Sequence, residues 1–293
     1  MEIEDLETFI EIADGGGIST AARRLGVSKS VVSRQLARLE AALGAQLLSR
    51  STRGAALTEA GTTFREHAAR IIGELEAARD AMAPQGAPRG LLRIAAPLSG
   101  GPGLIAPALA ELARRHPLLQ VHATYSDRFV DLVAEGFDAA IRLGYLPDSS
   151  LVARRIRPMS GMLVASPAYI AAHGAPRTLD DLADHACLMQ GTESWPLMDR
   201  GKLVTVHPRG RFKADNGEAL LSAALAGLGV AALPDFLIEA HVASGALTPV
   251  LTDYPSPEAG IYVVRPPGAY PARKIRVLID LLIEHCGKVH KRS

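Results

Sequence analysis

The sequence predicts a mixed α/β protein with a helical amino-terminal part, one long helix, and a carboxyl-terminal part in which strands alternate with helices. Three observations support this fold class. Apolar residues recur at helical spacing up to residue 82, a Pro- and Gly-containing stretch interrupts the pattern at residues 83–88, and short apolar runs follow from residue 90. A chain of 293 residues is long enough for two domains.

Three helices are predicted before residue 45. The first covers residues 3–13, and its apolar residues share one face: Ile3, Leu6, Phe9, Ile10 and Ala13. The second is short, with Ser19 or Thr20 as its cap, and ends at Gly26, which suits the left-handed conformation. The third begins at a Ser28 cap and ends at Gly44, and its buried stripe is Val32, Leu36, Leu39 and Leu43.

The second and third helices, joined by a tight turn, predict a helix-turn-helix at about residues 19–38. The exposed face of the third helix carries short polar and basic side chains, as a helix entering the major groove of DNA requires. Residues 23–53 carry a net charge of +6 although the whole chain carries +1, so the remaining residues sum to −5. We therefore expect DNA contacts from Ser19, Thr20, Ser28, Lys29, Ser30, Ser33, Arg34, Arg38, Arg50, Thr52 and Arg53.

Residues 46–57 predict a two-stranded wing, because a basic turn at residues 50–54 lies between apolar flanks. Its tip would lie against the DNA backbone. A solvated helix face is the alternative for the basic side chains, and Arg38 is evenly balanced between the two because it lies late in its helix. Arg23 and Arg24 have a further alternative, since their stems can simply cover apolar surface.

A long helix capped by Thr58 is predicted to run to about residue 82. Its apolar residues follow a heptad seam: Phe64, Ala68, Ile71, Leu75, Ala78 and Met82. Such a seam favours a partner helix and hence a homodimer, although a core within the same chain is the alternative. Residues 83–88 are interpreted as a hinge or linker.

Beyond residue 90 the pattern is typical of an α/β domain with a largely parallel sheet. Strands are expected at 91–96, 119–125, 138–143, 161–165, 229–233 and 261–264. Helices are expected near 103–115, 128–135, 167–173, 216–226, 234–243 and 271–286.

The chain resembles the LysR-type transcriptional regulators over essentially its whole length. The resemblance rests on Ala21-Ala22-Arg23-Arg24-Leu25-Gly26-Val27-Ser28, Ser33-Arg34-Gln35-Leu36, Leu39-Glu40, Arg50-Ser51-Thr52-Arg53-Gly54 and Leu57-Thr58-Glu59-Ala60-Gly61. Residues 126–133 and 138–144 are also similar to one branch of that family. Lys29 stands where the family often has Gln, so the operator cannot be copied from relatives.

The resemblance implies a winged helix-turn-helix DNA-binding domain at 1–59, a linker and dimerisation helix at 60–89, and a periplasmic-binding-protein-like effector domain at 90–293. Lobe I would comprise 90–160 and 267–293, and lobe II 161–266. The implied function is transcriptional regulation by dimers or tetramers on an interrupted palindromic operator. The implied partners are double-stranded DNA, a small-molecule effector and the chain itself as homodimer or homotetramer, with RNA polymerase a candidate further partner.

An effector site is expected between the lobes. The loop from Ser99 to Gly103 follows the first strand of this part and opens a helix, so its free backbone N–H groups could hold a carboxylate or another anion. Together with family effector sites, this selects Ser99, Gly100, Ser126, Thr192, Phe212 and Asn216. The alternative for these positions is an ordinary cap or turn.

No catalytic centre, metal site or cofactor is expected. Gly227-Leu228-Gly229 lies in a G-x-G-x-x-A pattern, but a helix precedes it and a strand follows, the reverse of a dinucleotide fingerprint. Two alternatives stay open: a solute-binding or enzymatic α/β protein with a vestigial helix-turn-helix, and a redox-sensing regulator using Cys187 and Cys286. With acidic residues at the amino terminus, no export signal and no apolar membrane span, the expected location is the cytoplasm.

Overall fold

The computed structural model describes residues 1–293 except 52–53, 83–85, 147, 192–193, 268–270 and 290–293. The chain divides into two compact units. The first comprises residues 1–88 with the short segments 130–138 and 268–276, and the second comprises residues 89–129, 139–267 and 277–293.

The first unit contains four helices and a two-stranded wing within its described residues up to 82. They are α1 (Ile3–Gly15), α2 (Ile18–Leu25), α3 (Lys29–Leu43), β1 (Leu48–Ser51), β2 (Gly54–Leu57) and α4 (Glu59–Met82). Helix α1 packs against the other three helices. The core between them is apolar and includes Leu6, Phe9, Ile12, Val32, Leu36, Leu39, Leu47 and Ala68.

The ends of these helices follow local sequence signals. Ser28 caps α3 by accepting a hydrogen bond from the N–H of Val31 at 3.4 Å, and Gly26 and Gly44 end α2 and α3 with positive φ, as predicted. The predicted cap of the second helix was wrong. Helix α2 begins at Ile18, directly after Gly17, whose φ is 137°, and the Ile18 side chain packs against the core. Ser19 and Thr20 therefore fall inside the first turn.

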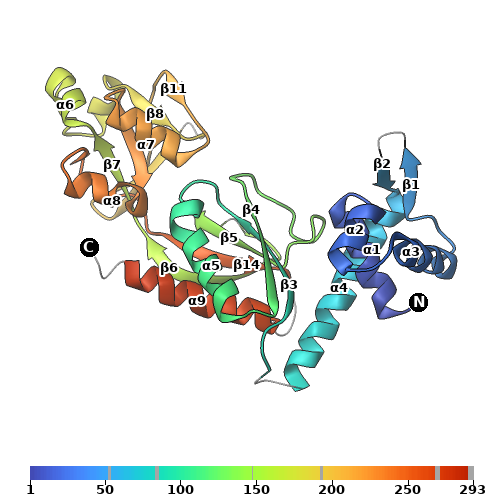
Figure 1. Ribbon diagram of the computed structural model, residues 1–293. Helices are drawn as coiled ribbons and strands as arrows, with labels where there is room; N and C mark the ends of the chain where they lie inside the picture. Colours follow the sequence, from blue (N-terminus) through green and yellow to red (C-terminus); the bar gives the residue numbers. More distant parts are fainter. Residues whose placement is uncertain (52–53, 83–85, 147, 192–193, 268–270, 290–293) are drawn as a thin grey trace. The chain divides into compact units, whose positions relative to one another are not determined.

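Among its described residues, the second unit holds two five-stranded sheets (Figure 1). The first has the order β4-β3-β5-β14-β6, in which β3, β4 and β5 are parallel and β14 runs antiparallel to β5 and β6. Its strands are β3 (Gly90–Ala96), β4 (Leu119–Tyr125), β5 (Ala139–Gly144), β6 (Val152–Met159) and β14 (Ala259–Arg265).

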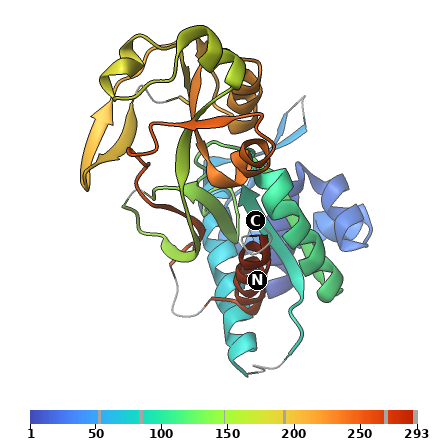
Figure 2. The same ribbon diagram turned by 90° about the vertical axis from the view of Figure 1, so that its left-hand side faces the viewer.

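The second sheet has the order β11-β8-β12-β7-β13. Its strands are β7 (Gly161–Ala165), β8 (Cys187–Met189), β11 (Phe212–Lys213), β12 (Val230–Pro234) and β13 (Thr248–Val250). A separate antiparallel hairpin consists of β9 (Trp195–Asp199) and β10 (Lys202–Val206). Figure 2 shows the second sheet, in yellow and orange, forming a lobe of its own with its helices.

The helical segments after residue 100 are the π-helix η1 (Gly101–Ile105), α5 (Ala106–Arg115), α6 (Pro167–His173), the 3-10 helix η2 (Asp180–Ala183), α7 (Gly217–Leu225), α8 (Asp235–Ala243) and α9 (Arg273–Val289). Helix α5 packs against β4 of the first sheet, and α7 against β12 and β8 of the second.

All six strands expected in this part are present, within one to two residues at most ends. The helix expected near residues 128–135 is wrong: the N–H groups of Val133 and Ala134 bond to the Asp131 carboxylate at 3.0 Å, and a turn forms instead. The chain also returns to the first sheet earlier than expected. Strand β14, placed in lobe II by its sequence position, pairs with β5 and β6 of lobe I.

Candidate nucleic-acid interface and effector site

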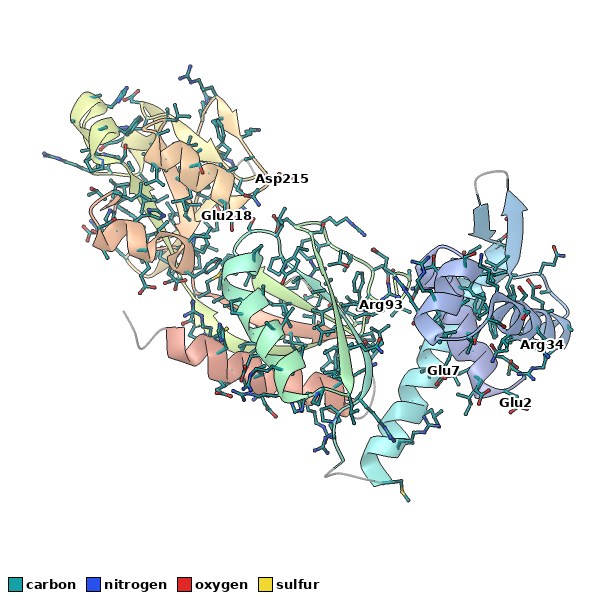
Figure 3. All side chains as sticks on the ribbon, in the orientation of Figure 1. Glu2, Glu7, Arg34, Arg93, Asp215 and Glu218 are labelled. Atoms are coloured by element: carbon teal, nitrogen blue, oxygen red, sulfur yellow. The ribbon has the colours of Figure 1, made fainter. Side chains whose placement is uncertain are left out.

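The leading end of α3 presents an exposed polar and basic surface. Val32, Leu36 and Leu39 are buried on one side of the helix, which leaves Lys29, Ser30, Ser33 and Arg34 exposed on the other. The Oγ atoms of Ser28 and Ser30 lie 2.8 Å apart at the start of the helix. Figure 3 labels Arg34 on this helix. These side chains carry hydrogen-bond donors and acceptors suited to contacts with base edges and phosphates.

Arg38, one turn after Arg34, is held by the protein itself. Its Nε donates to both oxygens of Asp5, at 3.0 and 3.1 Å, and the Asp5 side chain is 0% exposed whereas that of Arg38 is 51% exposed. Burial alone would raise the pKa of Asp5, but the hydrogen bonds from Arg38 and from the backbone N–H of Glu2 bring it below its ordinary value. Arg38 thus joins α3 to α1, a role that the sequence prediction of DNA contact did not include.

The first turn of α2 carries the other two predicted contacts. Ser19 is exposed, whereas Thr20 is half-buried. The Thr20 methyl lies so close to Gly15 that a Cβ added to Gly15 would be 3.3 Å from it. Arg24 forms an exposed ion pair with Glu11 at 3.5 Å. Of the α2 residues, Ser19 is therefore the more accessible to DNA.

The base of the wing is fixed to both neighbouring helices. Glu40 of α3 accepts the N–H groups of Leu47 and Leu48 at 2.7 and 3.2 Å, and Thr58 donates its hydroxyl to the Gln46 carbonyl at 2.7 Å. Thr58 also accepts the N–H of Gly61 at 2.9 Å, which confirms it as the cap of α4. Arg50 lies on β1, while Thr52 and Arg53 fall outside the described residues.

The predicted seam of α4 divides into two parts. Phe64 and Ala68 pack inside the unit: the rings of Phe9 and Phe64 lie 5.6 Å apart, and Ala68 is fully buried. Ile71 and Met82 are 45% and 87% exposed, Ala78 is exposed and Leu75 is half-buried. The first two seam residues therefore belong to the chain's own core, and the last four leave apolar surface open. Beside the start of the helix, residues including Leu43, Leu47, Ala60 and Phe64 line an open groove.

Ser99 and Gly100 contact the start of α7 across the two sheets of the second unit. The Ser99 hydroxyl donates to Asp127 at 2.8 Å and accepts the N–H of Gly217 at 2.9 Å, while the N–H of Gly100 donates to Glu218 at 2.6 Å. A Cβ on Gly100 would lie 2.1 Å from the Phe236 ring, so only glycine fits there. Figure 3 labels Glu218 in this part of the molecule.

The expectation of free N–H groups in this loop was wrong for its first two residues. Ser99 donates its N–H to Asp127 at 3.0 Å, and Gly100 donates to Glu218. Both donors therefore already face carboxylates of the chain. The second oxygen of Glu218, Oε2, is buried and has no hydrogen-bond partner among the described residues.

The other predicted effector residues are dispersed. Asn216 caps α7 by accepting the N–H of Ala219 at 3.1 Å, next to the Ser99 contact. Ser126 follows β4 and accepts the N–H of Arg128 at 3.3 Å, and Phe212 lies in β11. Thr192 falls outside the described residues. Sequence reasoning missed two residues of this contact. Asp127 lies 28 residues from its partner Ser99, and Glu218 lies 118 residues from its partner Gly100.

Both cysteines are buried and unpaired with each other. Burial raises the pKa of Cys187 to about 11, although a backbone hydrogen bond opposes it, and burial also raises that of Cys286 despite the nearby Arg157. Because the thiolate is the reactive form, this environment gives the redox-sensing alternative no support.

Metal-ligating side chains do not gather in groups of three or more within the part of the chain that the structure describes. Among the same residues, none of the helices combines the length and hydropathy that a membrane span requires.

Comparisons with protein families match both parts of the chain. The family model "Bacterial regulatory helix-turn-helix protein, lysR family" matches residues 3–62, and the model "LysR substrate binding domain" matches residues 85–287. The chain is 36% identical to the HTH-type transcriptional regulator PtxR of Pseudomonas aeruginosa, covering 98% of this chain and 94% of that protein. It is 34% identical to the regulator CrgA of Neisseria meningitidis, covering 97% of each.

Solved structures share this fold over nearly the full length. The structure of CrgA from Neisseria meningitidis is 32% identical, with a TM-score of 0.62 over 98% of this chain and 99% of that one. The full-length Vibrio cholerae virulence activator AphB is 28% identical, with a TM-score of 0.60 over 97% of this chain and 100% of that one. The full-length C199D variant of OxyR from Pseudomonas aeruginosa has the same fold at 19% identity, with a TM-score of 0.71 over 96% and 94% of the two chains.

Proposed function

The chain belongs to the LysR family of DNA-binding transcriptional regulators, and from this premise we propose how its own residues divide the work. Residues 1–59 bind the operator, residues 60–89 join two chains, and residues 90–293 bind a small-molecule effector. The working form is a dimer or a pair of dimers on an interrupted, dyad-symmetric site in double-stranded DNA, with RNA polymerase a further partner at the promoter.

The observation that carries the DNA-binding proposal is the exposed leading end of α3. Lys29, Ser33 and Arg34 project from a helix whose opposite side is buried, so they are available to a major groove. The helix also starts at a Ser28 cap with no acidic residue in its first turn, which leaves its positive end open to a phosphate. Arg50, on strand β1 of the wing, would add a contact to the phosphate backbone of the DNA.

Dimerisation is supported by the open half of the α4 seam. Ile71, Leu75, Ala78 and Met82 follow heptad spacing over surface that the chain does not cover fully. A second α4 packed along these residues would remove that apolar surface from water. Phe64 and Ala68, which the same seam includes, instead fix the helix to the DNA-binding core of its own chain.

Effector binding is supported by the contact between the Ser99 loop and α7. Ser99 and Gly100 come from the first sheet and Gly217 and Glu218 from the helix on the second, so a molecule inserted here would change how the two sheets approach. The buried Oε2 of Glu218 lacks a partner that an effector with a hydrogen-bond donor would provide. An effector that binds one arrangement of the two sheets more tightly than another would shift the protein toward that arrangement. The result would be changed promoter contacts and DNA bending, and not a catalysed reaction.

The experiment that tests the DNA-binding proposal is a gel shift with the Arg34→Ala variant. The probe is the genomic fragment that footprinting selects with the full-length protein. Removing a phosphate or base contact from each subunit should weaken binding at least tenfold and reduce the salt dependence of the affinity. Arg177→Ala, which removes an exposed charge from the second unit, is the matched control and should bind normally. Equal affinities for the two variants would contradict the assignment of α3.

A further inference from the structure

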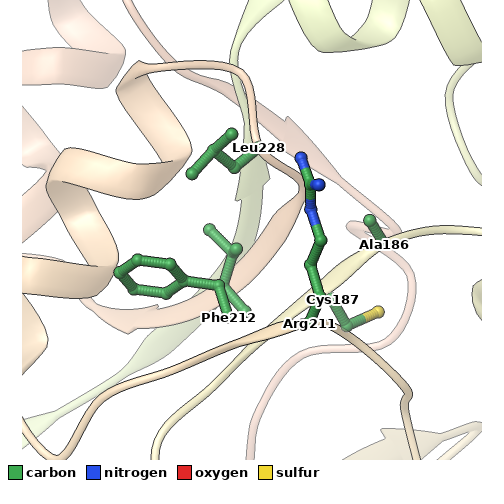
Figure 4. Close-up of a pocket in the computed structure, with 6 residues that line it drawn as sticks. Ala186, Cys187, Arg211, Phe212 and Leu228 are labelled. Carbon is green, nitrogen blue, oxygen red and sulfur yellow. The ribbon is translucent and has the colours of Figure 1, made fainter.

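A pocket lies beside β8 in the second sheet, and of its lining residues only Cys187 and Phe212 figure in the site described above. It has a volume of about 200 Å³, and Figure 4 shows its wall. The lining residues are Ala186, Cys187, Leu188, Arg211, Phe212 and Leu228. Apart from the Arg211 guanidinium, the side chains are apolar or thiol groups, so the pocket favours an apolar body.

Close backbone approaches fix the walls of this pocket. Strand β8 pairs in parallel with β11 on one side and β12 on the other. A Cβ on Gly229 would lie 2.2 Å from the Ala186 carbonyl oxygen, and a Cβ on Gly210 would lie 1.7 Å from that of Cys187. The glycines therefore let the loop carrying Leu228 and the segment carrying Arg211 approach β8 closely. The pocket is therefore bounded by backbone segments that pack closely against β8.

Arg211 supplies a positive charge at the pocket. Figure 4 shows its side chain crossing the pocket, with the guanidinium between Leu228 and Ala186. The residue is exposed and forms no ion pair or side-chain hydrogen bond within the described part of the chain. Residues 200–214 contain five Lys and Arg residues and no Asp or Glu, so the local field favours an anion. A guanidinium binds a carboxylate through two parallel hydrogen bonds.

We propose that this pocket binds a small carboxylate with an apolar body, such as an aromatic or short aliphatic acid. Arg211 holds the carboxylate, and Leu188, Phe212 and Leu228 contact the apolar body. The site is distinct from the Ser99 contact and gives the second sheet its own ligand. Because β8 pairs with both β11 and β12, a bound acid would stiffen the edge at which β11 ends the sheet.

Isothermal titration calorimetry of the full-length protein with benzoate and hexanoate tests this proposal. Benzamide, which has nearly the shape of benzoate without its charge, is the ligand control. Benzoate should bind saturably, and benzamide should bind at least tenfold more weakly because it cannot pair with Arg211. Trp195 is the only tryptophan of the chain and packs in the same core as Cys187, so its fluorescence gives a second readout.

Matched variants locate the site. Arg211→Gln should weaken benzoate binding at least tenfold, whereas Arg209→Gln removes the same charge two residues away, outside the lining, and should change it less than twofold. Ser99→Trp places a bulky side chain where Ser99 contacts the start of α7, away from the pocket, and should leave benzoate binding unchanged.

Four results would overturn the proposal. The first is equal binding by wild type and Arg211→Gln, and the second is equal affinity for benzoate and benzamide. The third is no saturable binding up to ~10 mM, a concentration at which even a weak carboxylate site would be occupied. Loss of binding in Ser99→Trp alone would place the acid at the Ser99 contact instead and would equally contradict the pocket.

Discussion

The two ends of helix α3 differ in what their charged side chains do. At the leading end, Lys29 and Arg34 are exposed and have no ion pair among the described residues. At the trailing end, Arg38 is bonded to the buried Asp5 and Glu40 accepts two N–H groups of the wing. On the function proposed above, one helix thus contacts DNA with its leading end and holds the domain together with its trailing end. Positive charge alone does not reveal which of the two an arginine does.

The largest effect is expected where the wing meets α4. In a Gly61→Ala variant, the added Cβ would lie 2.0 Å from the Leu47 carbonyl oxygen, a clash that the backbone must move to relieve. We expect the first unit to lose its cooperative unfolding transition and DNA binding to be lost with it. Circular dichroism during heating measures the first effect and a gel shift the second. Gly73→Ala, at a position with open space around it, is the control and should behave as wild type. A normal Gly61→Ala protein would show that the wing is not anchored at this contact.

A smaller effect is expected from Asp5→Asn, which keeps the shape of the side chain and removes its charge. The folded state lowers the pKa of Asp5, so its carboxylate stabilises the fold above the unfolded pKa of about 4, and this contribution is lost as the pH falls through the folded value. The variant should therefore melt a few degrees below wild type at pH 7 and converge with it as the pH falls below the lowered pKa of Asp5.

Thermal unfolding across this pH range measures that convergence. Glu4→Gln, an exposed acid on the same helix, serves as control and should melt like wild type at pH 7. A pH-independent difference between Asp5→Asn and wild type would show that the Arg38 contact acts through shape and not through charge.

The smallest effect on stability is expected at the leading end, from Ser28→Ala. Loss of the 3.4 Å cap to Val31 should cost about 1 kcal/mol of helix stability, because an exposed cap is partly replaced by water. Denaturant unfolding of wild type and variant gives this value. A loss much larger than that of Asp5→Asn would mean that the leading end also holds the domain together, and the contrast between the ends would fail.

Sequence patterns predicted the features of this chain that neighbouring residues decide. The caps at Ser28 and Thr58 and the glycine ends at Gly26 and Gly44 need only a few adjacent residues, and all four are present. The strands with long apolar runs, such as β3 and β4, were predicted for the same reason.

Contacts between distant residues were not predictable in this way. The Asp5–Arg38 pair spans 33 residues and the Gly100–Glu218 bond spans 118, so no local spacing in the sequence predicts either contact. Strand β8 has three residues and exists because β11 and β12 pair with it. The heptad seam of α4 shows the same limit: the pattern is continuous, but only the fold reveals that Phe64 belongs to the core and Met82 to the surface.

The most direct test of the contrast within α3 compares Arg34→Ala with Arg38→Ala in two measurements, DNA affinity and melting temperature. Arg34→Ala should weaken binding to the footprinted fragment at least tenfold and leave the melting temperature unchanged. Arg38→Ala should lower the melting temperature because the buried Asp5 carboxylate loses its charged partner. Its DNA affinity, measured well below that temperature, should fall much less. Equal changes in both measurements for the two variants would contradict the division of α3 into a reading end and a holding end.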